Sequence, residues 1–385
     1  MIHTLIKRII SVLAISLCAV FAFLPAFGAE AAGTSVLDTD AMFTTRDLDQ
    51  QPKAENVRVL HVSDGQTLSI TEEGVYVIQG QASEATIMVE ASDEAKIQLV
   101  LDGVRITNSD FPCIYVKSAD KVFVTTSADS SLTVTSSFRS DGEIKTNSVI
   151  FSRSDLVLNG TASLTISSSN HGIVSKDDLK ITGGKYFLTA AHHALKANDS
   201  IRIAGGNLTL NAGEDGLHAE NDEDPTKGYI YIAGGQFDIT VKDDAIHAES
   251  VLQIDKGDFQ ISASEGLEGT YIQINGGTIH IQSSDDGINA AQKSSAYRAT
   301  FEINGGDITV VMGAGDTDGV DSNGDLIING GTINVTGNSG FDYDGSSSFN
   351  GGTIIVNGQQ LDSIPNQMMG GRGGMGFGGK RRQWS

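Results

Sequence analysis

The sequence predicts an all-β fold, a single parallel β-helix whose coils of about 21 to 22 residues each contribute three short strands. Three observations predict it. Apolar and polar residues alternate with a period of two throughout, and no stretch of the mature chain shows the 3.6-residue period of a helix. A unit of acid, Gly, apolar, polar, small and polar residues recurs from Val149, mostly at steps of 21 or 22 residues. No hairpin-type returns separate its strands, which favours stacked parallel coils.

The N-terminal residues predict export. A basic start at Lys7 and Arg8 precedes an apolar run and a group of small residues, which is the pattern of a secretory signal peptide over residues 1–31. The mature protein is therefore expected to be secreted, in the extracellular space or at the cell surface. Residues 32–56 are polar and lack a period, so they are expected to form a linker or an N-terminal cap.

The β-helix domain is expected over residues 57–360. Gly-Gly pairs recur once per coil after Val149 and suit corners that need a positive φ. Two coils are longer than the rest, and their surplus falls at Glu220–Tyr229 and Ala290–Ala299, which we interpret as inserted loops. Residues 361–385 are Gly-rich, basic and unpatterned, and are expected to be a disordered tail.

The net charge of -22 argues against a nucleic-acid partner, because phosphate binding depends on clustered Lys and Arg. Beyond the signal peptide, no apolar run approaches the roughly 18 residues of a membrane-spanning helix. Acids concentrated at repeated positions suggest a cation as the partner instead. The oligomeric state is not determined by the sequence, and a monomer is the simplest expectation.

Acidic residues recur at fixed positions of the repeat. In KDDAIHAES, Lys242 to Ser250, alternation directs Ile246 and Ala248 inward and His247 and Glu249 outward, with Asp244 at the preceding turn. Equivalent residues of other coils should stack into columns. The turn column is His171, His193, Asp215, Asp244, Glu265, Asp286 and Asp318. The first outward column is His218, His247, Glu268, Asn289, Asp321 and Asp342, and the next is Glu220, Glu249, Thr270, Ala291, Asn323 and Asp344.

Stacked carboxylates about 4.8 Å apart repel one another unless a cation lies between them. Calcium takes 6 to 8 oxygen ligands at about 2.3 to 2.6 Å, which suits this spacing. The predicted cofactor is Ca²⁺, with ligands from Asp215, Asp244, Glu265, Glu268, Asp286, Asp318, Asp321, Asp342 and Asp344. Two alternatives stay open. The acids could simply keep an exposed sheet soluble, or a transition metal could bind His193, His218 and His247.

The block EEGVYVIQGQASEATIMVEASDEAKIQLVLDGVRITNSDFPCIYVKSADKVFVTT, followed by repeats of the DGLHAE and INGGTI type, resembles the polysaccharide-lyase-like, carbohydrate-binding β-helix proteins secreted by bacteria. The resemblance covers residues 57–358. It implies a right-handed parallel β-helix with bound calcium that acts as an adhesin for plant cell-wall polysaccharide, cellulose or acidic pectin-type sugars. It also implies binding in preference to cleavage.

The resemblance and the charge pattern together suggest how a polysaccharide would bind. An acidic protein should repel polyuronate unless bound calcium presents positive charge to it, whereas neutral glucan needs aromatic platforms. The candidate contacts are Lys196, His218, His247, Tyr229, Tyr297 and Arg298.

Two other functions remain possible from the sequence. A calcium-dependent pectate lyase would need a Lys or Arg base, and Lys196 is the candidate because it shares the outward column of His218 and His247. No local lyase motif surrounds Lys196. A purely structural surface protein would bind no polysaccharide at all.

Overall fold

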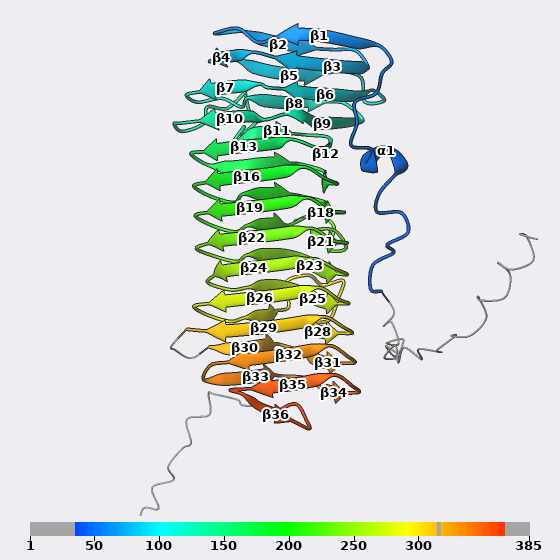
Figure 1. The fold of residues 1–385 in the computed structure, drawn as a ribbon, viewed down its shortest axis with the longest axis vertical. Coiled ribbons are helices and arrows are strands. Elements are labelled where there is room, and N and C mark those ends of the chain that lie inside the picture. Colours follow the sequence, from blue (N-terminus) through cyan, green and yellow to red (C-terminus); the bar gives the residue numbers. More distant parts are fainter. Residues whose placement is uncertain (1–34, 314–316, 366–385) are drawn as a thin grey trace, which may run out of the picture. The chain divides into compact units, whose positions relative to one another are not determined.

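The computed structural model describes residues 35–313 and 317–365, all within one compact unit, Ala31–Ser385. The predicted signal peptide and residues 366–385 of the predicted tail lie outside this range. The described residues form an all-β structure with one short helix, α1 (Thr45–Leu48), and long parallel sheets of stacked coils (Figure 1). The predicted all-β, solenoid-like architecture is confirmed to that extent. Within the described ranges, no helix is long and apolar enough to cross a membrane.

Strand pairings follow three ladders, in which each strand pairs with the equivalent strand of the next coil. Ladder 1 is a 13-stranded sheet that is parallel except for its last strand. Its strands are β4 (Gln81–Ser83), β7 (Arg105–Asn108), β10 (Ser130–Val134), β13 (Ser163–Ser168), β16 (Lys185–Ala190), β19 (Asn207–Ala212), β22 (Gln236–Val241), β24 (Asp258–Ala263), β26 (Thr278–Ser283), β29 (Asp307–Met312), β32 (Thr332–Thr336), β35 (Thr353–Val356) and β36 (Gln359–Leu361).

Ladders 2 and 3 together form a 23-stranded sheet. Ladder 2 contains β2 (Thr67–Ile70), β5 (Thr86–Glu90), β8 (Ile114–Ser118), β11 (Ser148–Ser152), β14 (His171–Ser175), β17 (Leu195–Ala197), β20 (Leu217–Ala219), β27 (Ile288–Ala290), β30 (Asp318–Ser322) and β33 (Ser339–Tyr343). Ladder 3 contains β1 (Val57–His61), β3 (Gly74–Gln79), β6 (Lys96–Asp102), β9 (Lys121–Ala128), β12 (Asp155–Gly160), β15 (Asp178–Ile181), β18 (Ser200–Ile203), β21 (Tyr229–Ile232), β28 (Thr300–Ile303), β31 (Asp325–Ile328) and β34 (Ser347–Phe349).

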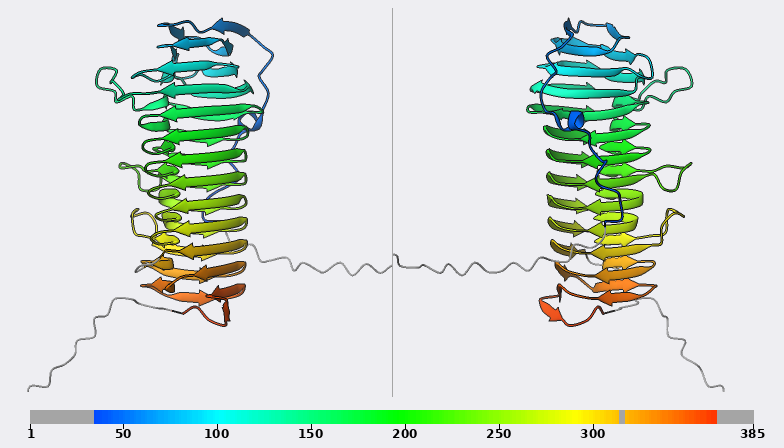
Figure 2. Two further views of the ribbon diagram at one scale, coloured as in Figure 1. Left: turned by 60° about the vertical axis from the view of Figure 1, so that its left-hand side comes forward. Right: turned by 90° about the vertical axis from the view of Figure 1, so that its right-hand side faces the viewer.

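Two strands, β23 (Ile246–Ile254) and β25 (Leu267–Ile274), belong to ladders 2 and 3 at once. In these coils the chain passes from one ladder to the other without a break. The neighbouring coils carry insertions at 220–228 and 291–299, which separate β20 from β21 and β27 from β28. The inserted loops, together with the segment between β10 and β11, project from the same side of the stack (Figure 2).

Most apolar side chains of the three ladders point inward and form one continuous core. Along ladder 2 the inward column is Leu195, Leu217, Ile246, Leu267, Ile288, Val320 and Phe341, and each member is at most 1% exposed. These apolar residues pack against their counterparts one coil away, so burial fixes the register of the outward residues as well.

Amide side chains stabilise one corner of the last coils. Asn304 Nδ2 donates to Asn275 Oδ1 at 2.8 Å, Asn329 Nδ2 donates to Asn304 Oδ1 at 2.7 Å, and Asn350 Nδ2 donates to Asn329 Oδ1 at 2.7 Å. Each Asn precedes a Gly-Gly pair. At Gly306 φ is +92°, and a Cβ there would lie 2.8 Å from the carbonyl oxygen of Gly277. The corner therefore requires glycine.

The segment expected to be a linker or cap runs along the outside of ladder 3 from residue 35 onward; we call residues 35–53 the strap (Figure 1). Its backbone N–H groups at Val36 and Lys53 donate to Gln273 Oε1 at 3.1 Å and to Gln98 Oε1 at 3.0 Å. In α1, Asp47 is fully buried, and its carboxylate lies 3.5 Å from Lys121 Nζ and 3.4 Å from Lys180 Nζ. The strap thus contacts coils far apart in the stack.

A glycine after the turn residue tests how tightly the coils stack. A Cβ on Gly287 would lie 2.3 Å from Val310 Cγ1 and 2.6 Å from the carbonyl oxygen of Gly319. We expect Gly287→Ala to lower the free energy of unfolding by about 1 to 3 kcal/mol through overpacking. Gly205→Ala, where a Cβ meets no atom within 4 Å, is the control and should change it by less than about 0.5 kcal/mol. Urea unfolding checks both, and equal effects would contradict the stacking.

Candidate cation and carbohydrate site

The outward column of ladder 2 has the composition that the repeat predicts. Strand register places Lys196, His218, His247, Glu268, Asn289, Asp321 and Asp342 directly over one another, one residue per coil. Nearer the N-terminus the same column is apolar: Tyr115 stacks on Phe151 and Phe151 on Val174, and these side chains form a separate small core with Phe111 and Ile144. Ladder 2 therefore changes from covered apolar residues to Lys, His and acids along the stack.

The turn column has a structural role that the sequence analysis missed. His171 Nδ1 accepts the backbone N–H of His193, and His193 Nδ1 accepts that of Asp215, both at 3.2 Å. Asp215 Oδ1 accepts the N–H of Asp244 at 3.0 Å, and Asp286 Oδ1 accepts that of Asp318 at 2.8 Å. A histidine Nδ1 and an aspartate Oδ1 stand the same number of bonds from Cα, so the two residue types can alternate in this column.

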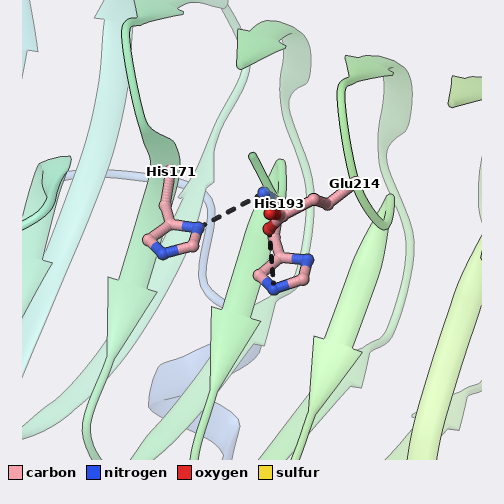
Figure 3. Close-up of side chains that lie close together, drawn as sticks. All are labelled: His171, His193 and Glu214. Atoms are coloured by element: carbon pink, nitrogen blue, oxygen red, sulfur yellow. Dashed lines mark hydrogen bonds and ion pairs between the residues drawn. The ribbon is translucent and has the colours of Figure 1, made fainter. Parts of the chain in front are cut away.

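The coil of His193 also carries a contact outside the predicted columns. His193 Nε2 lies 3.2 Å from Glu214 Oε2, as Figure 3 shows together with the His171 hydrogen bond. The other oxygen, Glu214 Oε1, lies 2.5 Å from His192 Nδ1. His192 and His193 therefore both contact the carboxylate of Glu214.

The first acidic cluster comprises Asp244, Glu265 and Glu268, each of which offers one oxygen within 4.8 Å of the others. It has its own cations: His247 Nδ1 lies 2.6 Å from Glu268 Oε2 and Lys293 Nζ lies 2.7 Å from Glu268 Oε1. Burial alone would lower the pKa of His247, but the hydrogen bonds to Asp244 and Glu268 outweigh it and raise that pKa to about 10. Burial and the neighbouring carboxylates raise the pKa of Glu265 to about 8.

The second acidic cluster lies in the last coils and comprises Asp286, Asp318, Asp321, Asp342 and Asp344. Burial, and then the charges of the other four aspartates, raise the pKa of Asp321 to about 7. In the rungs on either side of Asp321, Asn289 Oδ1 and Asp342 Oδ1 are buried and accept no hydrogen bond from the described residues. Excess negative charge beside unsatisfied oxygens is the combination that a hard cation would satisfy.

Asp215 differs from the other predicted calcium ligands. It is 3% exposed, and its Oδ2 lies 2.6 Å from His218 Nδ1 and 3.3 Å from His193 Nδ1. Both of its oxygens therefore already have partners. Of the nine predicted ligands, the structure places three in the first acidic cluster and five in the second, and Asp215 joins neither.

A polar cleft of about 440 Å³ lies beside the column, under the loop 220–228. Its lining includes the amines Lys176, Lys196 and Lys227 together with Glu220 and Asp199. Burial, and then the charge of Lys196, lower the pKa of Lys176. Lys196 Nζ lies 3.5 Å from Glu220 Oε2, and Lys227 Nζ lies 2.5 Å from Asp199 Oδ2. The lining thus combines three amines with five carboxylates, because Asp222, Glu223 and Asp224 of the loop also line the cleft.

The predicted sugar contacts are spread over several places. Lys196, His218 and His247 share the outward column. Tyr229 begins β21 instead of lying in the loop; its ring packs under Arg202 at 5.3 Å and its hydroxyl faces Met42 of the strap. The loop 291–299 does carry the other two, but Tyr297 is half-buried and Arg298 pairs with Asp325 at 2.8 Å. The structure thus does not bring these three together with the column.

Sequence reasoning placed Asn289 in the outward column without making it a ligand, and it did not include Lys293 or Lys227 among the site residues. Lys293 lies in the inserted loop 291–299, and the conformation of that loop cannot be predicted from the repeat. Its positive charge next to the acidic residues of the repeat nevertheless indicated that it could pair with them. The two inserted loops also contact each other, since Ser294 Oγ donates to the carbonyl oxygen of Pro225. They form one wall beside the column.

The chain is similar to proteins described as carbohydrate-binding domain-containing and as polysaccharide lyase-like. The model of the family described as carbohydrate-binding domain-containing protein matches residues 64–316. A carbohydrate-binding domain-containing protein of Acetivibrio thermocellus is 46% identical over 181 residues, which are 46% of this chain and 63% of the relative, so the match spans less than two thirds of the relative's length. The solved structure of a polysaccharide lyase-like protein from C. thermocellum, a gadolinium derivative, is similar with 33% identity and a TM-score of 0.50, over 58% of this chain and 93% of that one.

The raised pKa of Asp321 predicts how stability depends on pH in the absence of divalent ions. The folded state keeps a proton up to about pH 7, whereas the unfolded state loses it near pH 4. Stability should therefore fall as the pH rises from about 4 to 7 and then level off. In Asp321→Asn, which has no proton to lose, the drop between pH 5 and 8 should be smaller by about 2 kcal/mol. Urea unfolding in chelator measures it, with Asp307→Asn on ladder 1 as control. An unchanged drop in Asp321→Asn would contradict the assignment.

Proposed function

From the premise that this chain belongs to the family of carbohydrate-binding domain-containing proteins, we propose that it is a secreted protein that binds plant cell-wall polysaccharide with the help of calcium. That membership, with the similar polysaccharide lyase-like structure, confirms the resemblance noted in the sequence. Family membership indicates a carbohydrate ligand. Calcium, secretion and a preference for cellulose or acidic pectin are our proposals. We also propose that the coils wind to the right with three strands each, as the sequence predicts.

The observation that carries the calcium proposal is the pair of unsatisfied buried oxygens beside Asp321 in the second acidic cluster. The donor set there is entirely oxygen, which suits Ca²⁺ and suits softer ions poorly. Asp321, Asp342 and Asn289 would hold the ion, with help from the neighbouring aspartates. The first acidic cluster is the weaker candidate because His247 and Lys293 already supply positive charge to it.

A bound cation would change the charge that the outward column of ladder 2 presents to a polysaccharide. The protein carries a net charge of -22, which repels uronate chains. Calcium brings positive charge that uronate carboxylates can share, while Lys176 and Lys196 in the cleft supply amines on the same ladder. Acidic pectin-type chains are therefore the favoured ligand. A neutral glucan would need exposed aromatic platforms, and Tyr229 and Tyr297 are not positioned as such.

A pull-down on calcium pectate gel, with and without chelator, tests the proposal. We expect Asp321→Asn combined with Asp342→Asn to weaken calcium binding by about 10-fold or more, because two charged ligands are lost, and to reduce retention on pectate to the level seen with chelator. Asp307→Asn, an exposed acid on ladder 1, should behave as wild type. Retention that is indifferent to both chelator and the double substitution would overturn the calcium role. Absence of binding to pectate and to cellulose would favour a purely structural protein.

A pectate lyase is the second candidate function, and the amine of Lys176, whose pKa is lowered and which lines the same cleft as Lys196, is the observation that favours it. A base with a lowered pKa is unprotonated more often at neutral pH, as abstraction of the proton next to a uronate carboxylate requires.

Ultraviolet absorbance of the unsaturated product, with polygalacturonate and calcium, decides between lyase and binder. We expect no product from the wild type. Product that forms and then falls by about 100-fold or more in Lys196→Ala or Lys176→Ala would establish a lyase instead. Lys185→Ala, at an exposed amine of ladder 1, is the matched control.

A further inference from the structure

Four histidine rings stack along ladder 2 and its turn, but they are not equivalent. The ring centroids are 5.0 Å apart from His171 to His193, 4.3 Å from His193 to His218, and 4.7 Å from His218 to His247. In His171 and His193 the Nδ1 atom accepts a backbone N–H of the next coil. Figure 3 shows the first of these two hydrogen bonds. An imidazole nitrogen has one lone pair, so these two nitrogens are already used. The first two rings are parts of the backbone hydrogen-bond network.

In the other two rings Nδ1 faces an aspartate carboxylate instead of a backbone N–H group. Nδ1 of His218 lies 2.6 Å from Asp215 Oδ2, and Nδ1 of His247 lies 2.9 Å from Asp244 Oδ2. Asp215 Oδ1 accepts the backbone N–H of Asp244, so the carboxylate acts as an acceptor and the hydrogen belongs on His218 Nδ1. Histidine ligands of metal ions are typically oriented by such a carboxylate at one nitrogen, which leaves the other nitrogen for the metal. The nitrogen left in both rings is Nε2.

A glutamate follows each of these histidines after one alanine. The sequence His-Ala-Glu occurs at 218–220 and again at 247–249, in consecutive rungs of the ladder. Glu220 Oε2 lies 3.0 Å from His218 Nε2. Two ligands of a tetrahedral zinc ion, each at about 2.0 to 2.2 Å, stand about 3.3 Å apart. The observed pair is therefore close to the separation at which both atoms could hold one ion.

We propose that these two His-Ala-Glu rungs bind a divalent transition ion of the zinc type. Its ligands are Nε2 of His218, Nε2 of His247 and the carboxylate of Glu220, while Asp215 and Asp244 orient the two rings. The two rings lie 4.7 Å apart between centroids at an interplanar angle of 20° in this structure, so holding one ion through both Nε2 atoms requires the rings to turn toward each other. It also replaces the contact of Glu220 with Lys196, whose Nζ lies 3.5 Å away. Imidazole nitrogens favour zinc, copper and nickel over calcium. The site therefore differs in metal class and in location from the second acidic cluster.

Calorimetric titration of the chelator-treated full-length protein with Zn²⁺ tests this proposal, and the visible spectrum of a Co²⁺ complex reports the geometry. We expect one Zn²⁺ per chain that is not displaced by excess Ca²⁺. Glu220→Gln, at an exposed position, should weaken Zn²⁺ binding by about 10-fold or more without affecting folding. His218→Ala should do the same, and a circular-dichroism melt shows whether that variant is folded.

Three comparisons separate this site from its neighbours. His192→Ala, beside the stack, should bind Zn²⁺ as wild type does. Asp321→Asn should retain Zn²⁺ binding even where it loses Ca²⁺, so failure of the calcium proposal and failure of this one are distinguishable. Wild-type affinity in both Glu220→Gln and His218→Ala would overturn the proposal, and so would the absence of any Zn²⁺ binding below millimolar concentration.

Discussion

In the described coils, each residue of a paired strand lies one strand spacing, about 4.8 Å, from its equivalent in the next coil. This proximity is the constraint on which the rest of the structure depends. A column of leucines or isoleucines satisfies it by packing, and a column of asparagines by amide hydrogen bonds, as from Asn275 to Asn350. A column of carboxylates satisfies it only with protons or cations between the members, because like charges at that distance repel. The outward column of ladder 2 needs such compensation.

The protein meets this need in different ways along one face. Around Asp215 the ring of His218 lies 2.6 Å from one carboxylate oxygen and the backbone N–H of Asp244 donates to the other. Around Glu268 the loop amine Lys293 and the ring of His247 supply positive charge. Around Asp321 the groups that act on it are themselves carboxylates. The tendency to attract an external cation therefore increases toward the C-terminal coils, whereas nitrogen ligands are confined to the middle ones.

Much of this could be predicted from the sequence because repetition supplies the register. Leu217, Ile246 and Leu267 align in the sequence and stack in the structure, and the acids beside them follow. What does not repeat could not be predicted in the same way. The contact of Lys293 with Glu268 depends on the conformation of one inserted loop. Whether Tyr229 lies in the other loop or in a strand depends on where β21 begins. The acceptor role of His171 and His193 was hidden because it involves backbone groups, which leave no trace in side-chain patterns. The strap could not be placed from its polar composition.

The strap has a consequence for how the stack comes apart. Coils that touch only their neighbours would peel away from either end one at a time. Here the strap links coils that do not touch each other directly. Asp47 is buried between amines of two different coils, and backbone N–H groups of the strap donate to Gln98 and Gln273. A pulling force that separates the end coils must also break these contacts of the strap, so the coils are expected to come apart more cooperatively than coils held by their neighbours alone. Resistance of the stack to mechanical unfolding would then come in part from residues 35–53, which belong to none of the coils.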